Sequence, residues 1–291
     1  MPKTPKIRTF LAPKLKVGLR NYSANTVTIY LDHMNNFIKF HMKDPSLIEL
    51  EDITTYQIYL VYSKKVSYST FNLAVCSIKY FYRHILDKGF RIDLIPYQRK
   101  AKSLPNVLSK QEVMRIINAA VNLKNKAIIQ TIYSAGLRLS ELINLRIPDI
   151  DSKRMVIRVD QGKGKKDRYV MLSKILLSTL REYWKQAQPK PKTYLFPGVN
   201  PHTHFSRRSV QRIIKETTLL AHIDKTVTPH TLRHCFATHL LEAGENIRVI
   251  QKLLGHKSLR ATELYTHVAE NYINQTTSPL DSLSHENNKG G

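Results

Sequence analysis

The sequence predicts a mainly α-helical protein of two domains, with one small β-hairpin in the second domain. Three observations lead to this expectation. Apolar side chains recur at helical spacing, two short β-branched runs flank a glycine-containing turn, and a basic stretch between prolines divides the chain. With 291 residues, of which 42% are hydrophobic, each part is long enough to bury a core of its own.

Residues 1–95 are expected to form a small helical domain. Ser23 is a suitable helix N-cap, and the apolar side chains that follow recur at helical spacing over about four turns. A second helix is expected over residues 52–64. A third has an apolar stripe that begins at Phe71 and stops near Gly89.

Residues 96–106 lack periodicity and are expected to be a basic linker. The second domain is assigned to residues 107–275. It opens with Ser109 and Glu112 in capping-box register, followed by helical patterns that stop at Gly136.

Within the second domain, residues 155–172 contain the runs MVIRVD and DRYVML, separated by QGKGKK. This pattern predicts a β-hairpin with a basic tip. Residues 276–291 are expected to be a C-terminal tail. The remaining helices of the domain are expected over residues 139–145, 173–187, 206–222, 230–243, 246–254 and 258–266.

The charge of the chain favours a polyanionic partner. Lys and Arg number 46 against 22 Asp and Glu, a formal net charge of +24. Such an excess attracts nucleic acid above other partners. The 15 Tyr and 9 Phe supply core-forming material, which argues against a disordered polycation.

Cysteine usage and hydropathy indicate a cytoplasmic protein. The two cysteines, Cys76 and Cys235, are too few and too far apart for a disulfide framework or a thiolate metal site. The first 20 residues lack the apolar stretch of a secretory signal. No window approaches the roughly 18 apolar residues that a membrane span needs.

The segment Thr228-Pro229 is a strong helix start, because Thr is a good N-cap and Pro fits the first helical position. His230, Arg233 and His234 then fall on one side of the first turns, beside backbone N–H groups that favour an anion. This arrangement suits a phosphate. Taken singly, the histidines are more often core residues and the arginine more often faces solvent.

A metal site is not expected here. His230 is followed by Thr231 rather than Glu, so the zinc-binding pattern HExxH is absent, and no third ligand is placed by spacing. His202 and His204 lie in an expected loop. No cofactor motif is found, and none is expected.

Several motifs occur in a fixed order in the second domain. GLRLSEL contains Arg138, QGKGKKDR contains Lys163, and HTLRH contains His230 and Arg233. LLGH ends in His256, and Tyr265 in LYTHV follows nine residues later. Over residues 107–270 this set resembles the tyrosine recombinase, or phage integrase, family, with Xer-like and integron-integrase-like features. The first domain resembles the helical core-binding domain of that family in pattern only.

The resemblance implies a site-specific recombinase that cleaves and rejoins DNA through a covalent 3′-phosphotyrosyl intermediate, without metal or ATP. In that chemistry a nucleophile, a proton for the leaving oxygen and fixed positive charge are needed. The implied catalytic residues are Tyr265 as nucleophile, Arg138 and Arg233 as phosphate clamp, Lys163 as general acid, His230 as acceptor of the phenolic proton, and His256 as a phosphate hydrogen-bond partner.

Further basic side chains are candidates for DNA backbone contacts. Charge runs are usually just solvated faces, and none of these residues identifies a DNA sequence. They flank the expected hairpin tip and the start of a later helix: Lys165, Lys166, Arg168, Arg207 and Arg208.

The resemblance also implies a partner in double-stranded DNA and a homotetramer on two duplexes, with the tail docking in trans and accessory proteins as further partners. Two other functions stay open: a type IB topoisomerase, and a DNA-binding protein of the same fold without catalysis. Tyr272 is the rival nucleophile. Whether the biological role is integration, excision or resolution is not encoded in these motifs.

Overall fold

The computed structural model describes residues 22–86, 94–98, 106–160, 167–256 and 258–263. The chain divides into two compact units, Met1–Lys102 and Ser103–Gly291. Each has its own hydrophobic core. Among the described residues, no helix combines the length and the apolar character needed to cross a membrane.

The first unit is helical, as predicted. Ser23 caps α2 by accepting a hydrogen bond from the backbone N–H of Thr26. A short π-helical turn, Tyr59–Ser63, continues α3 and was not predicted. The helices of this unit are α2 (Ala24–His41), the 3-10 turn η1 (Pro45–Leu47), α3 (Leu50–Ile58) and α4 (Tyr68–His84).

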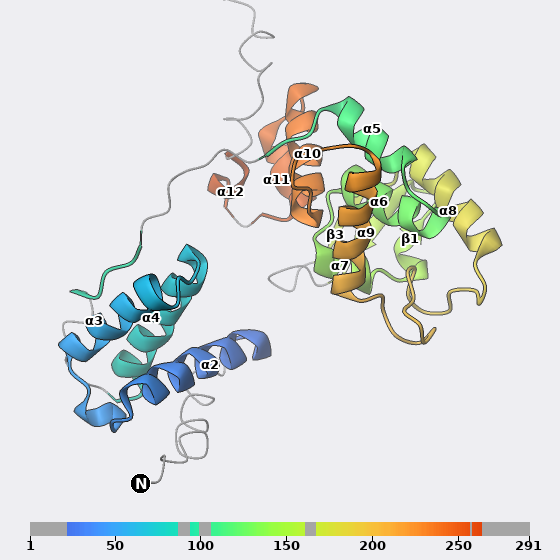
Figure 1. The fold of residues 1–291 in the computed structure, drawn as a ribbon. Helices are drawn as coiled ribbons and strands as arrows, with labels where there is room; N and C mark the ends of the chain where they lie inside the picture. Colours follow the sequence, from blue (N-terminus) through green and yellow to red (C-terminus); the bar gives the residue numbers. More distant parts are fainter. Residues whose placement is uncertain (1–21, 87–93, 99–105, 161–166, 257, 264–291) are drawn as a thin grey trace, which may run out of the picture. The chain divides into compact units, whose positions relative to one another are not determined.

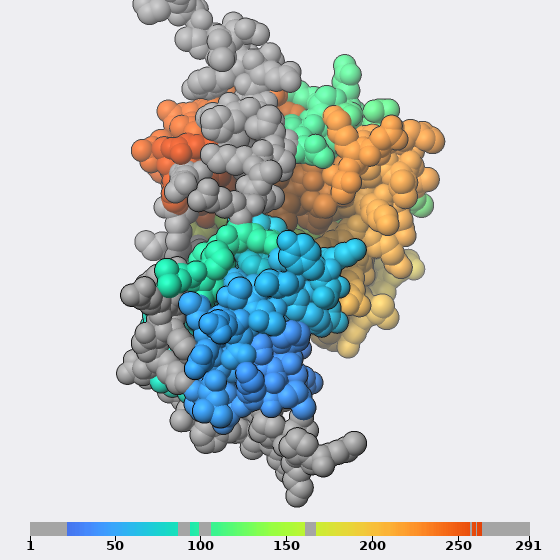
Figure 2. Space-filling view, turned by 60° about the vertical axis from the view of Figure 1, so that its left-hand side comes forward, coloured from blue at the N-terminus to red at the C-terminus, as the bar shows by residue number. Residues whose placement is uncertain are grey.

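Aromatic side chains fill the core of the first unit. Phe37 is fully buried and makes edge contacts with the rings of Tyr56 and Tyr82. The hydroxyl of Tyr82 donates to the backbone carbonyl of Pro45, which ties α4 to η1. On the outside, the side chains of α2 and α3 form a continuous surface in Figure 2.

The second unit is mainly helical with a small antiparallel sheet, ordered β1-β2-β3. The predicted hairpin is confirmed, with Val156 opposite Met171 and Val159 opposite Arg168. The two-residue strand β1 was not predicted. The strands are β1 (Ile150–Asp151), β2 (Val156–Val159) and β3 (Arg168–Met171).

Helix α6 is central to this unit and contacts α5, α7, α8, α9, α10 and β3 (Figure 1). The predicted capping box is confirmed, since Ser109 and Glu112 exchange hydrogen bonds at the start of α5. The helical patterns expected before Gly136 form two helices, α5 and α6. The helices are α5 (Lys110–Asn118), α6 (Leu123–Ala135), α7 (Leu139–Asn144), α8 (Lys174–Gln186), α9 (Arg207–Leu220), α10 (Pro229–Glu242), α11 (Ile247–Leu254) and α12 (Arg260–Glu263).

Candidate active site

The carboxylate of Glu141 lies at the centre of a buried arginine cluster in the second unit. It accepts hydrogen bonds from the backbone N–H of Arg138 at 2.7 Å and from Arg138 Nη1 at 2.8 Å. Arg168 donates to both carboxylate oxygens at 2.8 Å. Arg233 Nη1 lies 3.7 Å from Glu141 Oε2. One carboxylate therefore orients guanidinium groups from the start of α7, from β3 and from α10.

The electrostatics of this cluster favour a bound anion. Burial by itself raises the pKa of Glu141, but the hydrogen bonds and charge of Arg168, with hydrogen bonds from Arg138, outweigh burial and lower the pKa to about 2. Glu141 is therefore ionised at neutral pH. Its single negative charge leaves the positive charge of the arginines in excess, which suits a phosphate group.

Arg233 is almost fully buried, with only 2% of its surface exposed, so the alternative that it faces solvent is wrong. Its Nη1 donates to the backbone carbonyl of Gly136 at 2.6 Å, and its Nη2 donates to that of Leu254 at 2.7 Å. Nη2 also lies 3.2 Å from His256 Nε2. The C-terminal ends of α6 and α11 thus hold this guanidinium through their last carbonyl groups.

Two glycines make this arrangement sterically feasible. Gly136 and Gly255 end α6 and α11 with φ of 60° and 63°, which confirms the predicted helix stops. A Cβ at Gly136 would collide with the ring of Phe236. A Cβ at Gly255 would lie 3.1 Å from Cδ of Arg168. The carbonyl of Gly255 also accepts a hydrogen bond from Arg138 Nη2 at 3.3 Å.

His256 faces the same cluster from the end of α11. Its Nδ1 lies 3.0 Å from the hydroxyl oxygen of Thr262 on α12. Burial lowers the pKa of His256 to about 4, with further contributions from the nearby charges of Arg233, Arg138 and Arg168. The imidazole is therefore neutral at physiological pH.

His230 lies in the first turn of α10, one turn before Arg233, and is exposed. Burial of part of the ring and the charges of Arg233 and Arg138 lower the pKa of His230. The ring of His234 is 6.5 Å from that of His230, measured between centroids. A neutral imidazole at this position has a lone pair with which to accept a proton.

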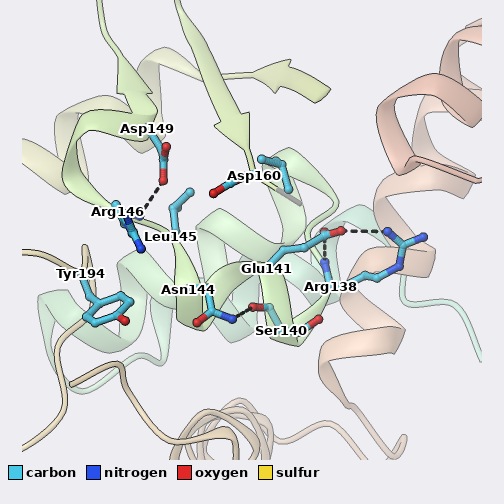
Figure 3. Close-up of a pocket in the computed structure, with 10 residues that line it drawn as sticks. Arg138, Ser140, Glu141, Asn144, Leu145, Arg146, Asp149, Asp160 and Tyr194 are labelled. Carbon is cyan, nitrogen blue, oxygen red and sulfur yellow. Dashed lines mark hydrogen bonds and ion pairs between the residues drawn. The ribbon is translucent and has the colours of Figure 1, made fainter. Parts of the chain in front are cut away.

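A pocket of about 640 Å³ opens beside Arg138 (Figure 3). In the close-up, the carboxylate of Glu141 lies between the backbone and the guanidinium of Arg138. Asp160, at the end of β2, forms part of the wall, as do Asp149 and Tyr194. Asp160 is the last described residue before the segment 161–166.

The structure brings Arg138, Arg233 and His256 together, with His230 on the same helix as Arg233. Lys163, Tyr265, Lys165 and Lys166 lie outside the described residues, as do Tyr272 and the predicted tail 276–291.

The described candidates for DNA contact differ from one another. Arg207 and Arg208 are exposed in the first turn of α9. The side chain of Arg168 is only 11% exposed and is turned inward, with Nε donating to the carbonyl of Leu253 at 2.7 Å. The geometry therefore favours a role for Arg168 in holding Glu141 over a role in contacting DNA.

Sequence reasoning missed two residues of the site, Glu141 and Thr262. Glu141 occupies the third position of a short helix that begins after Arg138, where an acidic side chain bonds back to the N-cap backbone. That spacing in GLRLSEL could have identified it. Thr262 carried no comparable signal, because its contact with His256 depends on how α12 packs.

Within the ranges that the structure describes, no group of three or more His, Cys, Asp or Glu side chains is placed to hold a metal ion. Cys235 is buried and is a free thiol whose pKa burial raises to about 11.

Family models match most of the chain. The model described as "Phage integrase family" matches residues 106–272, and "Phage integrase, N-terminal SAM-like domain" matches residues 12–91. A putative integrase/recombinase of Sinorhizobium fredii is 43% identical over 266 residues, which cover 91% of this chain and 86% of that protein. The tyrosine recombinase XerA of Pyrococcus horikoshii is 34% identical over 261 residues, covering 88% of each.

Solved structures show the same architecture. The crystal structure of the XerA recombinase is 32% identical with a TM-score of 0.54, covering 93% of this chain and 97% of that one. The XerH site-specific recombinase bound to its palindromic difH substrate has a TM-score of 0.71 at 21% identity, covering 90% and 82%. The predicted fold class is confirmed by these neighbours and by the elements described above.

Proposed function

The chain belongs to the phage integrase family and is a tyrosine-type site-specific recombinase, and from this premise we propose that it cuts and rejoins DNA through a covalent 3′-phosphotyrosyl intermediate, with neither metal nor ATP. The observation that carries the proposal is the convergence of Arg138, Arg233 and His256 around the buried carboxylate of Glu141. These groups form a positively charged site for one phosphate.

The two arginines clamp the scissile phosphate. A guanidinium offers planar paired donors and stays charged throughout the reaction, so it stabilises the charge on the non-bridging oxygens without a metal ion. Arg138 is partly exposed at 21% of its side chain, next to the pocket of about 640 Å³. Arg233 lies deeper and exchanges part of its present hydrogen bonds for the phosphate.

Tyr265 is the nucleophile. Its phenolic oxygen attacks phosphorus, a P–O bond to tyrosine forms, and the P–O bond to the 5′ oxygen of the next nucleotide breaks. The phenol of a free tyrosine has a pKa of about 10, so its proton needs an acceptor. His230 takes that proton, because the lowered pKa of its imidazole keeps the ring neutral, with a lone pair available.

Lys163 protonates the departing 5′ oxygen. The ammonium group of a lysine lies on a flexible stem and can give up a proton, whereas a guanidinium stays protonated. Lys163 belongs to the segment that directly follows Asp160 in the wall of the pocket. Rejoining is the reverse reaction, in which a 5′ hydroxyl attacks the phosphotyrosyl bond, so bond energy is retained and no ATP is consumed.

The partner is double-stranded DNA with a specific recombination site. The net charge of +24 supports this partner, as do solved neighbours whose names describe recombinases bound to DNA. Arg207 and Arg208 on α9, with Lys165 and Lys166, contact the phosphate backbone. The active assembly is a homotetramer on two duplexes, to which accessory proteins add, and the protein associates with the nucleoid when it acts.

The test is the capture of a covalent adduct. DNA that becomes attached to the protein in cells is recovered and sequenced, and the site is rebuilt as a duplex with a nick next to the scissile phosphate. Cleavage then releases a short strand that diffuses away, which traps the protein on DNA. The wild type is expected to accumulate the adduct.

The matched variants are Tyr265→Phe, which should form no adduct, and Tyr272→Phe, which should behave like the wild type. An adduct with Tyr265→Phe would overturn the assignment of the nucleophile. Catalytic relaxation of negatively supercoiled DNA without the recovered site would favour a topoisomerase instead. A protein that binds the site and forms no adduct would be a DNA-binding protein without catalysis.

A further inference from the structure

Thr262 joins the helix that precedes Tyr265 to the imidazole of His256. Its side chain is fully buried on α12, and its hydroxyl oxygen lies 3.0 Å from His256 Nδ1. The backbone of the same residue is fixed as well, because its N–H donates to the carbonyl of Leu259 at 2.6 Å. Both the backbone and the side chain of Thr262 are therefore held by hydrogen bonds.

The proton on the His256 ring follows from its two neighbours. A guanidinium has donors only, so the 3.2 Å contact between Arg233 Nη2 and His256 Nε2 makes Nε2 the acceptor. In a neutral imidazole the other nitrogen then carries the proton. Nδ1–H accordingly donates a hydrogen bond to the hydroxyl oxygen of Thr262, which accepts it with a lone pair.

We propose that Thr262 is a positioning residue, whose hydroxyl holds His256 in the Nδ1–H form with Nε2 turned toward Arg233 and the phosphate site. This rests on the function proposed above, because it assigns the group that aligns one member of that site. Thr262 acts through His256 and does not touch the substrate.

The charged and titratable groups that act on His256 come from α10, the start of α7 and β3. Arg233 and His234 lie on α10, Arg138 is the N-cap of α7, and Arg168 belongs to β3. The neighbour from α12 is the neutral hydroxyl of Thr262, while Glu263 on the same helix is exposed.

Phosphate binding changes the partner of Nε2. When the phosphate takes donors from Arg233, Nε2 faces an anionic oxygen, and the ring gains one proton there from solvent to donate to that oxygen. Thr262 remains the acceptor for Nδ1–H in both states. The hydroxyl thus keeps the ring aligned through a protonation step that a purely apolar neighbour would not support.

The same hydrogen bond fixes the turn of α12 from which the chain continues toward Tyr265, three residues later. Loss of the bond therefore affects both the imidazole and the start of the segment with the nucleophile.

The first experiment needs no variant. Histidine ¹⁵N resonances of the wild-type protein are followed with pH, with and without inorganic phosphate as the probe. We expect His256 to be protonated on Nδ1 in the free protein, and phosphate to raise its pKa. A free protein in which Nε2 carries the proton would overturn the proposal.

The second experiment compares isosteric variants. Thr262→Val keeps the branched shape without the hydroxyl, and Thr262→Ser keeps the hydroxyl. Thr238→Val is the matched control, because Thr238 is also fully buried and its hydroxyl has no hydrogen-bond partner among the described residues.

Thr262→Val should mix the His256 tautomers, lower the single-turnover rate on the nicked substrate by about tenfold and shift its pH profile, because one hydrogen bond to a charged group is lost. Thr262→Ser and Thr238→Val should stay within about twofold of the wild type. Unchanged tautomer, rate and pH profile in Thr262→Val would overturn the proposal. A wild type that forms no adduct would instead refute the proposed function, and the resonances of His256 would still decide the role of Thr262.

Discussion

The carboxylate of Glu141 decides how the arginines of the site are arranged. Its side chain is 5% exposed and bonds directly to Arg138 and Arg168, so its ionised form is paired on every side that the described structure shows. Removal of one partner from such a buried network leaves uncompensated charge, and that loss costs more than the pairing itself contributes. Stability and the proposed phosphate binding therefore depend on the same residue.

Glu141→Gln should destabilise the protein by roughly 3 kcal/mol at pH 7, because the arginines lose their counter-charge. The pKa of Glu141 falls from 4.5 to about 2 on folding, so its ionised form stabilises the protein above pH 4.5, and that stability is lost as the pH falls toward 2. In Glu141→Gln, the part of the loss of stability at low pH that comes from Glu141 should disappear. Urea denaturation at a series of pH values measures both effects.

His256 contributes in a different pH window. Its pKa falls from 6.5 to about 4 on folding, so acidification through that range also costs stability, and this loss should persist in Glu141→Gln. Glu216→Gln serves as the control, because Glu216 is 61% exposed and 3.8 Å from Arg212, and should change stability by less than about 0.5 kcal/mol. Equal stability of Glu141→Gln and the wild type at pH 7 would refute this role.

Arg168, Arg207 and Arg208 look alike in the sequence, but their substitution should affect DNA binding differently. Each phosphate contact removed lowers the slope of log affinity against log salt by about 1. Arg207→Gln and Arg208→Gln should each do so with nonspecific duplex DNA, since both side chains are exposed. Arg168→Met should leave the slope unchanged and lower thermal stability, because Arg168 is bonded to Glu141. A reduced slope for Arg168→Met would restore it as a DNA contact.

At the scale of elements, the start of α10 sets the position of His230 and Arg233. Thr228 accepts a hydrogen bond from the backbone N–H of Thr231 at 3.1 Å, and the Thr231 hydroxyl accepts one from the backbone N–H of Thr228 at 3.1 Å. Pro229 occupies the first helical position. These bonds fix the turn that precedes the buried guanidinium.

Thr228→Ala should therefore cost about 1 kcal/mol of stability, as the loss of an N-cap does. The single-turnover cleavage rate should fall as well, because the first turn of α10 contains His230. Thr228→Ser retains the capping oxygen and should match the wild type. Equal stability and cleavage rate of the alanine and serine variants would refute this role of the Thr228 cap.

Local signals in the sequence predicted the helices well. Ser23, Ser109 and Thr228 form the caps that their spacing indicated, and Gly136 and Gly255 end helices in the left-handed conformation. Each of these depends on a few adjacent residues. The unpredicted strand β1 pairs only two residues with β2, which is too short for a recognisable alternation.

The site was predicted only in part, for a physical reason. Arg138, Arg233 and His256 were identified from motifs, whereas the inward turn of Arg168 depends on a partner 27 positions away in the chain. A run of basic residues looks the same whether a member is solvated or buried. Burial and pairing are tertiary properties, so the sequence alone did not distinguish them.

At the scale of the whole molecule, the two units have separate hydrophobic cores. The core of the first unit is built on α2, α3 and α4, and that of the second on α6 and the elements around it. A defect in one core should therefore be felt mainly within its own unit.

Phe37→Ala tests this directly. Phe37 is fully buried, and its loss should cost the first unit about 3 to 5 kcal/mol. Hydrogen exchange should show faster exchange for peptides of α2 and α4, while peptides of α6 keep their protection. Leu47→Ala, at a side chain 70% exposed, is the control. Equal loss of protection in both units would contradict the separation of the cores.

We propose that the arginine cluster around Glu141 serves phosphodiester exchange by a tyrosine. The most direct measurement is mass spectrometry of the DNA-linked protein after digestion with trypsin and nuclease, since the peptide that follows Arg260 contains both Tyr265 and Tyr272. We predict a nucleotide joined through its 3′ phosphate to Tyr265. Attachment at Tyr272, attachment through a 5′ phosphate, or an unmodified peptide from protein that has cleaved its site would refute this role of Tyr265.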